Sequence, residues 1–346
     1  MTIHACATAD AGHTGMFESV IGTGGGTIAI SNTTARTGTY SFRCWSPNAT
    51  AGMTIYGALS APANIEQYAK VAILPRSPGG WNYNPEYTFL RWYEGTTQHI
   101  SIAYDCETGK VAAYRSSTLL GVSGSPLGAG EWNCLEIYVR CHNTEGLITV
   151  KNNGNTIMTL SGTLDTRNGG TAGTLDTAYL GVMTGNLVDG NDYFYLDDIV
   201  LADTWSGQGG LYVMPAIQDG SDIDWTASDA GARWDCVDEL PPSFTDYIYA
   251  DGATPNLKNT VGFGAMPITP ANIAFVGVYA RGKLDAAGAA NVRAIAKSGA
   301  TYSNGTAVNL GTDPAYVKHI MTLEPSLSAA WDQAAVEALN VGVETQ

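Results

Sequence analysis

The sequence has little charge, and its positive charge is not clustered anywhere. Charged residues make up 14% of the 346 residues, and 17 Lys and Arg stand against 32 Asp and Glu, for a net charge of −15. Contacts with phosphate backbones or anionic lipid need clustered cations. We therefore expect neither direct nucleic-acid binding nor membrane association. A surface built from Ser, Thr, Asn, Gly and Tyr suits an ordered assembly, sugar contact or an ordinary β-protein equally well.

Long hydrophobic runs and a basic start are also missing. No stretch approaches the roughly 18 apolar residues that a membrane-spanning helix needs. The first residues, MTIHACATADAGHTGMF, contain neither a basic region nor a long apolar core. We therefore expect no membrane insertion and no secretory signal peptide, with synthesis in the cytoplasm and release by lysis or a signal-independent route.

The cysteines lack the spacing of a metal or redox motif. None of the six forms a Cys-x-x-Cys pair, and Cys134, Cys141 and His142 match no common zinc pattern. Several cysteines stand inside strand-like runs. We expect six buried free thiols and no metal held by them.

What the sequence does contain is β-structure. Leu135, Ile137 and Val139 alternate with polar residues, a turn follows at 143–146, and a second strand at 147–150 ends in Asn152-Asn153-Gly154. Short strands with turn residues between them continue from about residue 22 to residue 203. With 45% hydrophobic residues to fill a core, this pattern predicts an all-β protein with a sandwich or a barrel in its N-terminal part.

A Gly- and Ser-rich segment, TWSGQGG at 204–210, predicts a linker between two domains, 1–203 and 211–346. The second domain is expected to be a smaller β-sandwich of the jelly-roll type. Near its end, residues 328–339 place Trp331, Val336 and Leu339 on one face of a short helix, with Gly342 as its cap.

The N-terminal part resembles the concanavalin-like lectin/glucanase superfamily in its laminin-G style. Three segments carry this resemblance: residues 36–42 (RTGTYSF), the hairpin at 132–154, and residues 193–201 (YFYLDDIVL). The resemblance covers about 17–203 and implies a two-sheet β-sandwich of the jelly-roll type, with calcium as an ion that relatives often carry.

The C-terminal part resembles a domain of tailed-bacteriophage virion proteins. The pattern consists of a Trp loop at Trp225, the acidic-Leu-Pro-Pro turn at 237–242, the strand at 246–248, the Arg-x-x-x-Asp segment at 281–285, and 325–331 leading to Gly342. This resemblance covers about 205–346 and implies a structural protein of a phage particle.

Catalytic patterns are missing. Glycosidases on lectin-like sandwiches carry Glu-x-Asp-x-x-Glu on one strand, which aims carboxylates into a cleft, and no such triplet occurs here. Asp197 and Asp198 are adjacent, so a regular strand would point them to opposite faces, and we expect one of them to cap or brace a neighbouring loop. Glu136 is expected to face solvent. We expect the protein not to be an enzyme.

Two kinds of loop are candidate binding sites. Asp189–Asp192 and Asp219–Asp224 place oxygen ligands close together, which calcium could use, although ordinary turns use the same residues. Trp81, Tyr83 and Tyr87 cluster in a Gly- and Pro-rich loop. If exposed, they mark a contact with a glycan or a subunit, and if buried, they belong to the core.

These observations favour a structural component of a bacteriophage virion, in a capsid-decoration, tail or fibre position. It would act through interfaces with other virion proteins as a homo-oligomer, with a trimer as the expected state. The alternative is a carbohydrate-binding adhesin on the same particle, contacting host surface glycan through the Trp81 loop. No cofactor is expected beyond the calcium considered above.

Overall fold

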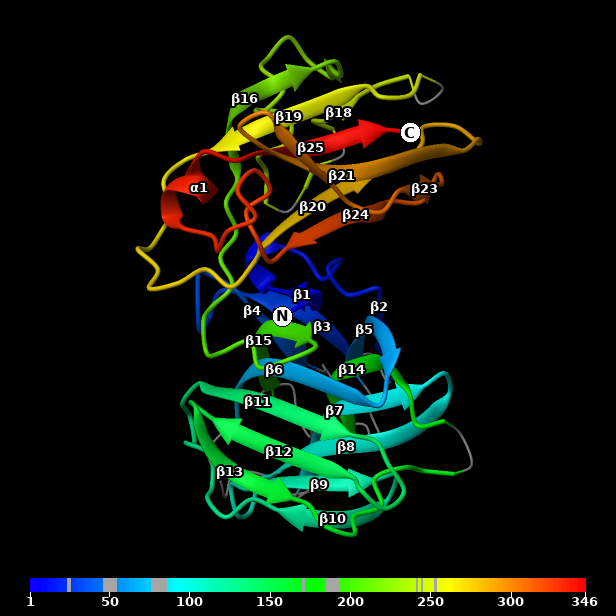
Figure 1. The fold of residues 1–346 in the computed structure, drawn as a ribbon, viewed down its shortest axis with the longest axis vertical. Coiled ribbons are helices and arrows are strands. Elements are labelled where there is room, and N and C mark those ends of the chain that lie inside the picture. Colours follow the sequence, from blue (N-terminus) through cyan, green and yellow to red (C-terminus); the bar gives the residue numbers. More distant parts are fainter. Residues whose placement is uncertain are drawn as a thin grey trace. The chain divides into compact units, whose positions relative to one another are not determined.

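The computed structural model describes residues 1–23, 26–45, 55–75, 86–169, 172–184, 193–240, 242–243, 245–251 and 254–346. The chain forms two compact units, Met1–Leu211 and Tyr212–Gln346 (Figure 1). The predicted fold class is confirmed, because nearly all regular structure is antiparallel strand and a short helix lies close to the end. Within the described residues, no helix has the length and apolar character that crossing a membrane requires.

The first unit is a sandwich of two antiparallel sheets. The first sheet runs in the order β13 (Asn155–Leu160), β12 (Leu147–Asn152), β11 (Asn133–Arg140), β6 (Glu66–Leu74), β15 (Tyr193–Ala202), β4 (Ser41–Trp45) and β3 (Thr27–Ser31), with β1 (Ile3–Ala7) also paired to β15. The second runs in the order β10 (Thr118–Val122), β9 (Val111–Arg115), β8 (Thr97–Asp105), β7 (Glu86–Glu94), β14 (Leu175–Thr184), β5 (Ile55–Asn64) and β2 (Ser19–Gly22).

The core of this unit lies between the two sheets. Strand β7 sends Phe89 and Trp92 inward, and β6 and β11 send Val71 and Ile137 from the other side, all with no exposed surface. Each such side chain contributes roughly 1.5–3 kcal/mol by leaving water. The alternation that buries one face of each strand leaves the other face of the second sheet free to carry polar groups.

The hairpin predicted at 132–154 is present as β11 and β12, and its second turn continues into β13. Asn153 and Gly154 have φ values of 46° and 80°, as a tight turn between two strands requires. The polar face of β11 is nevertheless covered, since Glu136 is 5% and Tyr138 6% exposed. The prediction that Glu136 faces solvent was therefore wrong, because chain from 204 onward lies across this face.

The segment predicted as a linker, 204–210, is hydrogen bonded to the first sheet and lies within the first unit. Trp205 packs edge-on against Tyr68 with ring centroids 5.1 Å apart. The Gly207 amide donates to Glu136 Oε1 at 3.0 Å, and Lys70 Nζ donates to the Gly209 carbonyl at 2.5 Å. These bonds satisfy two charged groups that the strand alternation places on the outer face.

The second unit contains one larger sheet and two strand pairs. The sheet order is β16 (Ala216–Ile223), β19 (Lys258–Phe263), β25 (Asn340–Thr345), β21 (Ala290–Ser298) and β22 (Thr301–Asn304), with β23 (Val308–Leu310) on β21. The pairs are β20 (Val276–Gly282) with β24 (Ala315–Met321), and β17 (Thr226–Ala227) with β18 (Ile248–Tyr249). A separate core forms here around Ala294, Val317 and Leu339.

The terminal helix α1 spans Gln333–Glu337 and is shorter than the predicted 328–339. Asp332 caps it by accepting a hydrogen bond from the Ala335 amide at 2.7 Å, so the helix starts only after this residue. Trp331 and Leu339 are buried on either side of it. Gly342 lies in β25 and does not cap the helix, because pairing with β19 and β21 extends the chain from Asn340.

Candidate functional site

The outer face of the second sheet carries a row of polar and aromatic residues. Strand register places Tyr179 of β14 opposite Arg91 of β7, Arg91 opposite Ser101 of β8, and Ser101 opposite Tyr114 of β9. Directly opposite residues in antiparallel strands point to the same face. The four side chains therefore form a continuous line across neighbouring strands. Figure 1 shows these strands, β14, β7, β8 and β9, side by side.

Three tyrosines stand at one end of this row. The ring of Tyr179 lies 4.7 Å from that of Tyr56 and 4.7 Å from that of Tyr93, measured between centroids. All three are half-buried. Tyr93 Oη donates to Gln98 Oε1 at 3.3 Å. Packed tyrosines of this kind offer apolar rings with polar tips at a surface, which is what a sugar ring needs for stacking and hydrogen bonding.

Beside the tyrosines the sheet face is hollowed. A cavity of about 470 Å³ lies over β7, β8 and β9. Its lining consists of Glu86, Thr88, Arg91, Gln98, Ser101, Tyr114, Ser116 and Ser117. Ligand sites in proteins have volumes of roughly 300–1,000 Å³, so this hollow is large enough for part of an oligosaccharide.

The ionisable groups of the hollow have distinct partners. Tyr114 Oη donates a short hydrogen bond to Glu86 Oε2. Burial raises the pKa of Glu86, and the Tyr114 hydrogen bond partly opposes that rise. Burial and the same hydrogen bond raise the pKa of Tyr114, so its hydroxyl stays protonated at neutral pH. Arg91 donates from Nη2 to the Met183 carbonyl at 3.3 Å.

A second hollow of about 540 Å³ adjoins the first, and the two share Ser116 and Ser117. Its wall also includes the 165–169 loop, where Asp165 is paired with Arg115. His99 Nδ1 accepts a hydrogen bond from the Asn168 amide at 2.9 Å and thereby holds this loop. Ser116 has a φ of 52°, an uncommon value for a residue other than glycine. Such strained positions cluster at binding sites.

Of the aromatic cluster predicted from the sequence, Trp81, Tyr83 and Tyr87, the structure describes only Tyr87. Trp81 and Tyr83 lie in 76–85, outside the described residues. Tyr87 has no exposed surface and belongs to the sandwich core. It therefore takes the buried alternative for this cluster, because strand β7 turns its position inward. Other residues line the two adjoining hollows on the sheet face, which we call the groove.

One of Asp197 and Asp198 was predicted to brace a neighbouring loop, and in the structure both carboxylates hold the same one. Asp197 Oδ2 accepts from the Arg36 amide at 3.0 Å, and Asp198 Oδ2 pairs with Arg36 Nη1 at 2.6 Å. A register shift in β15 and a φ of 49° at Asp198 break the regular alternation here. Burial and the charge of Asp198 raise the pKa of Asp197 to about 7.

The structure describes one of the two loops considered for calcium. The loop Asp189–Asp192 lies entirely within 185–192, outside the described residues. In the other loop, Asp219 accepts from the Trp234 amide, Asp222 from Tyr302 Oη, and Asp224 from the Lys258 amide. These carboxylates have separate partners and are used as turn and sheet connections.

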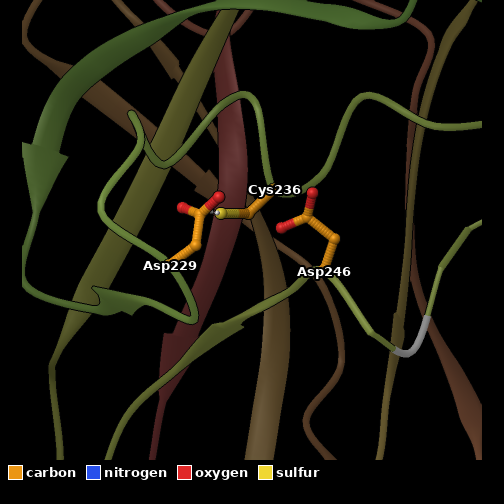
Figure 2. A group of neighbouring side chains, drawn as sticks. All are labelled: Asp229, Cys236 and Asp246. Carbon is orange, nitrogen blue, oxygen red and sulfur yellow. Dashed lines mark hydrogen bonds between the residues drawn. The ribbon is translucent and has the colours of Figure 1, made fainter.

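Three other side chains of the second unit, of types that can bind metals, lie close together: Asp229, Cys236 and Asp246 (Figure 2). One ligand atom from each lies within 4.8 Å of the other two. The Cys236 thiol donates to Asp229 Oδ1 at 3.5 Å, and burial together with the two carboxylates raises its pKa to about 11. The thiol is therefore protonated at neutral pH and acts as a hydrogen-bond donor. All six cysteines are buried and free, as predicted.

Sequence reasoning missed the residues of the groove. Strand β14, which carries Tyr179, was not anticipated, although Ala178, Leu180 and Val182 alternate with Thr177, Tyr179 and Gly181. The same signal was available in β7, where Arg91 stands among buried neighbours. Alternation identifies such outward positions, but only register shows that they form one row.

No protein-family model matches the chain, and no curated protein matches it. Solved structures with a similar fold include the cellulose induced protein Cip1, at 20% identity and a TM-score of 0.41, which spans 56% of this chain and 94% of that one. Alginate lyase vAL-1 from Chlorella virus matches at 14% identity and a TM-score of 0.39, over 59% of this chain and 100% of that one.

Domain 4 of AbnA, a GH43 extracellular arabinanase from Geobacillus stearothermophilus, was solved in complex with arabinotriose. It matches at 17% identity and a TM-score of 0.38, over 58% of this chain and 91% of that one. These likenesses concern the fold. The second and third of these proteins are named as a lyase of alginate and as a domain of an arabinanase with bound arabinotriose, and none of the three names describes a phage virion protein.

The comparisons correct one expectation. The missing glucanase triplet led us to expect a protein that is not an enzyme, but alginate lyases are among the structures with a similar sandwich. The absence of one glycosidase motif therefore does not separate this chain from enzymes of the same fold. What the geometry provides is a polar, tyrosine-flanked groove on a jelly-roll sandwich.

Proposed function

We propose that the first unit binds a polysaccharide along the outer face of its second sheet. One observation carries this proposal: Arg91, Ser101 and Tyr114 line a hollow, and the row continues beside it to Tyr179, whose ring packs between those of Tyr56 and Tyr93. Tyrosine rings supply apolar area at low conformational cost, and the polar floor supplies hydrogen bonds. This groove offers the adhesin alternative a glycan contact among the described residues, and the Trp81 loop stays an untested prediction.

The proposal predicts a loss of glycan binding in Tyr179→Ala. This ring stands between two others, so its removal takes away stacking surface in the middle of the platform. A loss of about 1.5 kcal/mol, roughly tenfold in Kd, is expected from one aromatic contact. Affinity electrophoresis in gels cast with a panel of neutral and acidic polysaccharides measures it.

Tyr249→Ala is the matched control, because Tyr249 is 51% exposed and lies in the second unit. It should bind as the unchanged protein does. Both variants are checked for an unchanged thermal transition. If no polysaccharide of the panel retards the unchanged protein, or if Tyr179→Ala binds as strongly as the control, the proposal is wrong.

A second candidate function concerns the second unit, where large apolar side chains are exposed. Leu327 is 77%, Leu323 51% and Ile217 48% exposed. Exposed apolar residues mark protein interfaces when they gather in patches. We propose that these side chains contact other subunits of a bacteriophage particle, with a homotrimer as the proposed state.

This candidate predicts that an antibody against the folded chain labels phage particles from a lysate of the source culture in immunogold electron microscopy. Label on heads favours capsid decoration, and label on tails favours host contact. Unlabelled intact particles, with an epitope shown to be accessible on the folded protein, would remove the virion location and leave the glycan-binding proposal untouched.

A further inference from the structure

Two guanidinium groups in the groove have no carboxylate partner. The Nε atom of Arg91 is buried and has no hydrogen-bond partner among the described residues, and the same is true of Arg167 Nε in the adjoining hollow. Neither residue forms an ion pair in the described part of the chain. Both side chains are half-buried. A cation that has lost part of its hydration and gained no anion raises the free energy of the folded protein.

Several other cations of the molecule do have a carboxylate partner. Arg36 pairs with Asp198, Arg293 with Glu344, and Lys297 with Asp222. With 32 acidic residues for 17 basic ones, carboxylates are abundant in this chain. Two arginines with a buried, unsatisfied Nε and no ion pair among the described residues nevertheless line adjoining hollows of one sheet face, and such a site favours an anion supplied from outside.

The carboxylates of the groove are already engaged. Asp165 is paired with Arg115, and Glu86 accepts the hydrogen bond of Tyr114. The lining thus has three arginines for two carboxylates, in a protein whose net charge is −15. The lining of the two hollows therefore has a sign opposite to the net charge of the whole molecule.

We infer that the groove selects an acidic polysaccharide, one of whose acidic groups binds Arg91 while another, further along the chain, binds Arg167. The polymer crosses the Ser116–Ser117 turn, which is the wall that the two hollows share. Guanidinium groups bind carboxylates and sulfates through paired, charge-assisted hydrogen bonds, which ammonium groups cannot reproduce. This inference rests on the proposed glycan binding and adds the charge class of the ligand.

The test compares polymers that differ only in charge. Polygalacturonate is set against its fully methyl-esterified form, and dextran sulfate against dextran, by isothermal titration of the full chain at 50 and 300 mM salt. We expect binding to a charged polymer and at least tenfold weaker binding to its neutral counterpart. The first pair reports carboxylate recognition, and the second reports sulfate recognition.

Variants locate the effect. Arg91→Gln and Arg167→Gln should each weaken binding of the charged polymer about tenfold, and Arg91→Lys should recover only part of it, since the lysine keeps the charge but loses the fork. Arg140→Gln is the control, because Arg140 pairs with Glu66 on the first sheet. A fall of the same size in this control would indicate a general charge effect and overturn the inference.

The inference and the proposed function fail differently. Equal binding of charged and neutral polymers, lost in Tyr179→Ala but unchanged in Arg91→Gln, overturns the acidic selectivity and keeps glycan binding. Absence of binding to every polymer overturns both. Binding to the charged polymer that survives in the double variant Arg91→Gln/Arg167→Gln overturns the assignment of these two residues.

Discussion

The turn at Arg36–Gly38 is held by buried carboxylates from distant parts of the first unit. Asp10 Oδ1 accepts from the Thr39 amide at 2.7 Å and from the Tyr40 amide at 2.9 Å. Asp197 and Asp198 hold the other side of the turn. Charge-assisted hydrogen bonds to backbone amides are stronger than neutral ones, so this turn is a rigid point of the fold.

Gly38 is required at this turn for two reasons. Its φ is 62°, and a Cβ there would lie 1.7 Å from Asp10 Oδ2. Gly38→Ala therefore has to displace Asp10 from its hydrogen bonds as well as strain the backbone. We expect a loss of about 3 kcal/mol in the free energy of unfolding, measured by urea denaturation followed by tryptophan fluorescence.

Gly95 gives the matched control for this prediction. Its φ is 55°, but nothing lies within 4 Å of the Cβ position, so Gly95→Ala tests the backbone strain alone. A loss of about 1 kcal/mol is expected there. Equal losses in both variants would mean that the Asp10 contact does not matter.

At the residue scale, the sequence predicted roles better than positions. The six buried thiols followed from apolar surroundings, and the bracing role of Asp197 and Asp198 followed from the absence of a catalytic partner. That both carboxylates reach the same turn did not follow, because the positive φ of Asp198 breaks the alternation on which the prediction depended. A bulge is a tertiary compromise that local sequence does not record.

At the element scale, the segment after β15 has the largest effect on the first unit. Arg36 Nη2 donates to the Gln208 carbonyl at 2.6 Å, and the Leu211 amide donates to Asp198 Oδ1 at 2.6 Å. Trp205 adds its ring to Tyr68, with Lys151 Nζ 3.8 Å from its centroid. Residues 204–211 therefore cover part of the outer face of the first sheet and are bonded to it.

A first unit that ends at Asp203 should consequently be less stable than one that ends at Leu211. Loss of the Trp205 packing and of these hydrogen bonds should cost about 3 kcal/mol, or on the order of 6–12 °C in Tm for a protein of this size. Differential scanning calorimetry of the two truncated chains measures the difference. Identical transitions would show that 204–211 is a linker in energetic terms.

The strands that were predicted and those that were missed differ in a physical way. β6, β7, β8, β11 and β15 are rich in β-branched and aromatic residues and lie within their sheets, so composition and periodicity revealed them. β10 and β16 are edge strands with exposed apolar residues, and their pattern is not that of a half-buried strand. The terminal helix was predicted to start too early because Asp332 was not recognised as its N-terminal cap.

At the scale of the whole molecule, each unit has its own hydrophobic core. The larger core draws on both sheets of the first unit, and the smaller one is built around β21, β24 and the helix region. Two cores agree with the chain length, since single cores rarely keep growing beyond about 250–300 residues. The chain length by itself therefore favoured two units.

The sequence by itself determined the all-β class, the buried thiols, the central strands and the two-part organisation, because these depend on local periodicity and on composition. Only the tertiary structure decided which residues form the groove, that Tyr87 is core, and that 204–211 covers Glu136. Such features depend on strand register and on contacts between residues far apart in the chain. A row such as Tyr179, Arg91, Ser101 and Tyr114 exists only once four strands lie side by side.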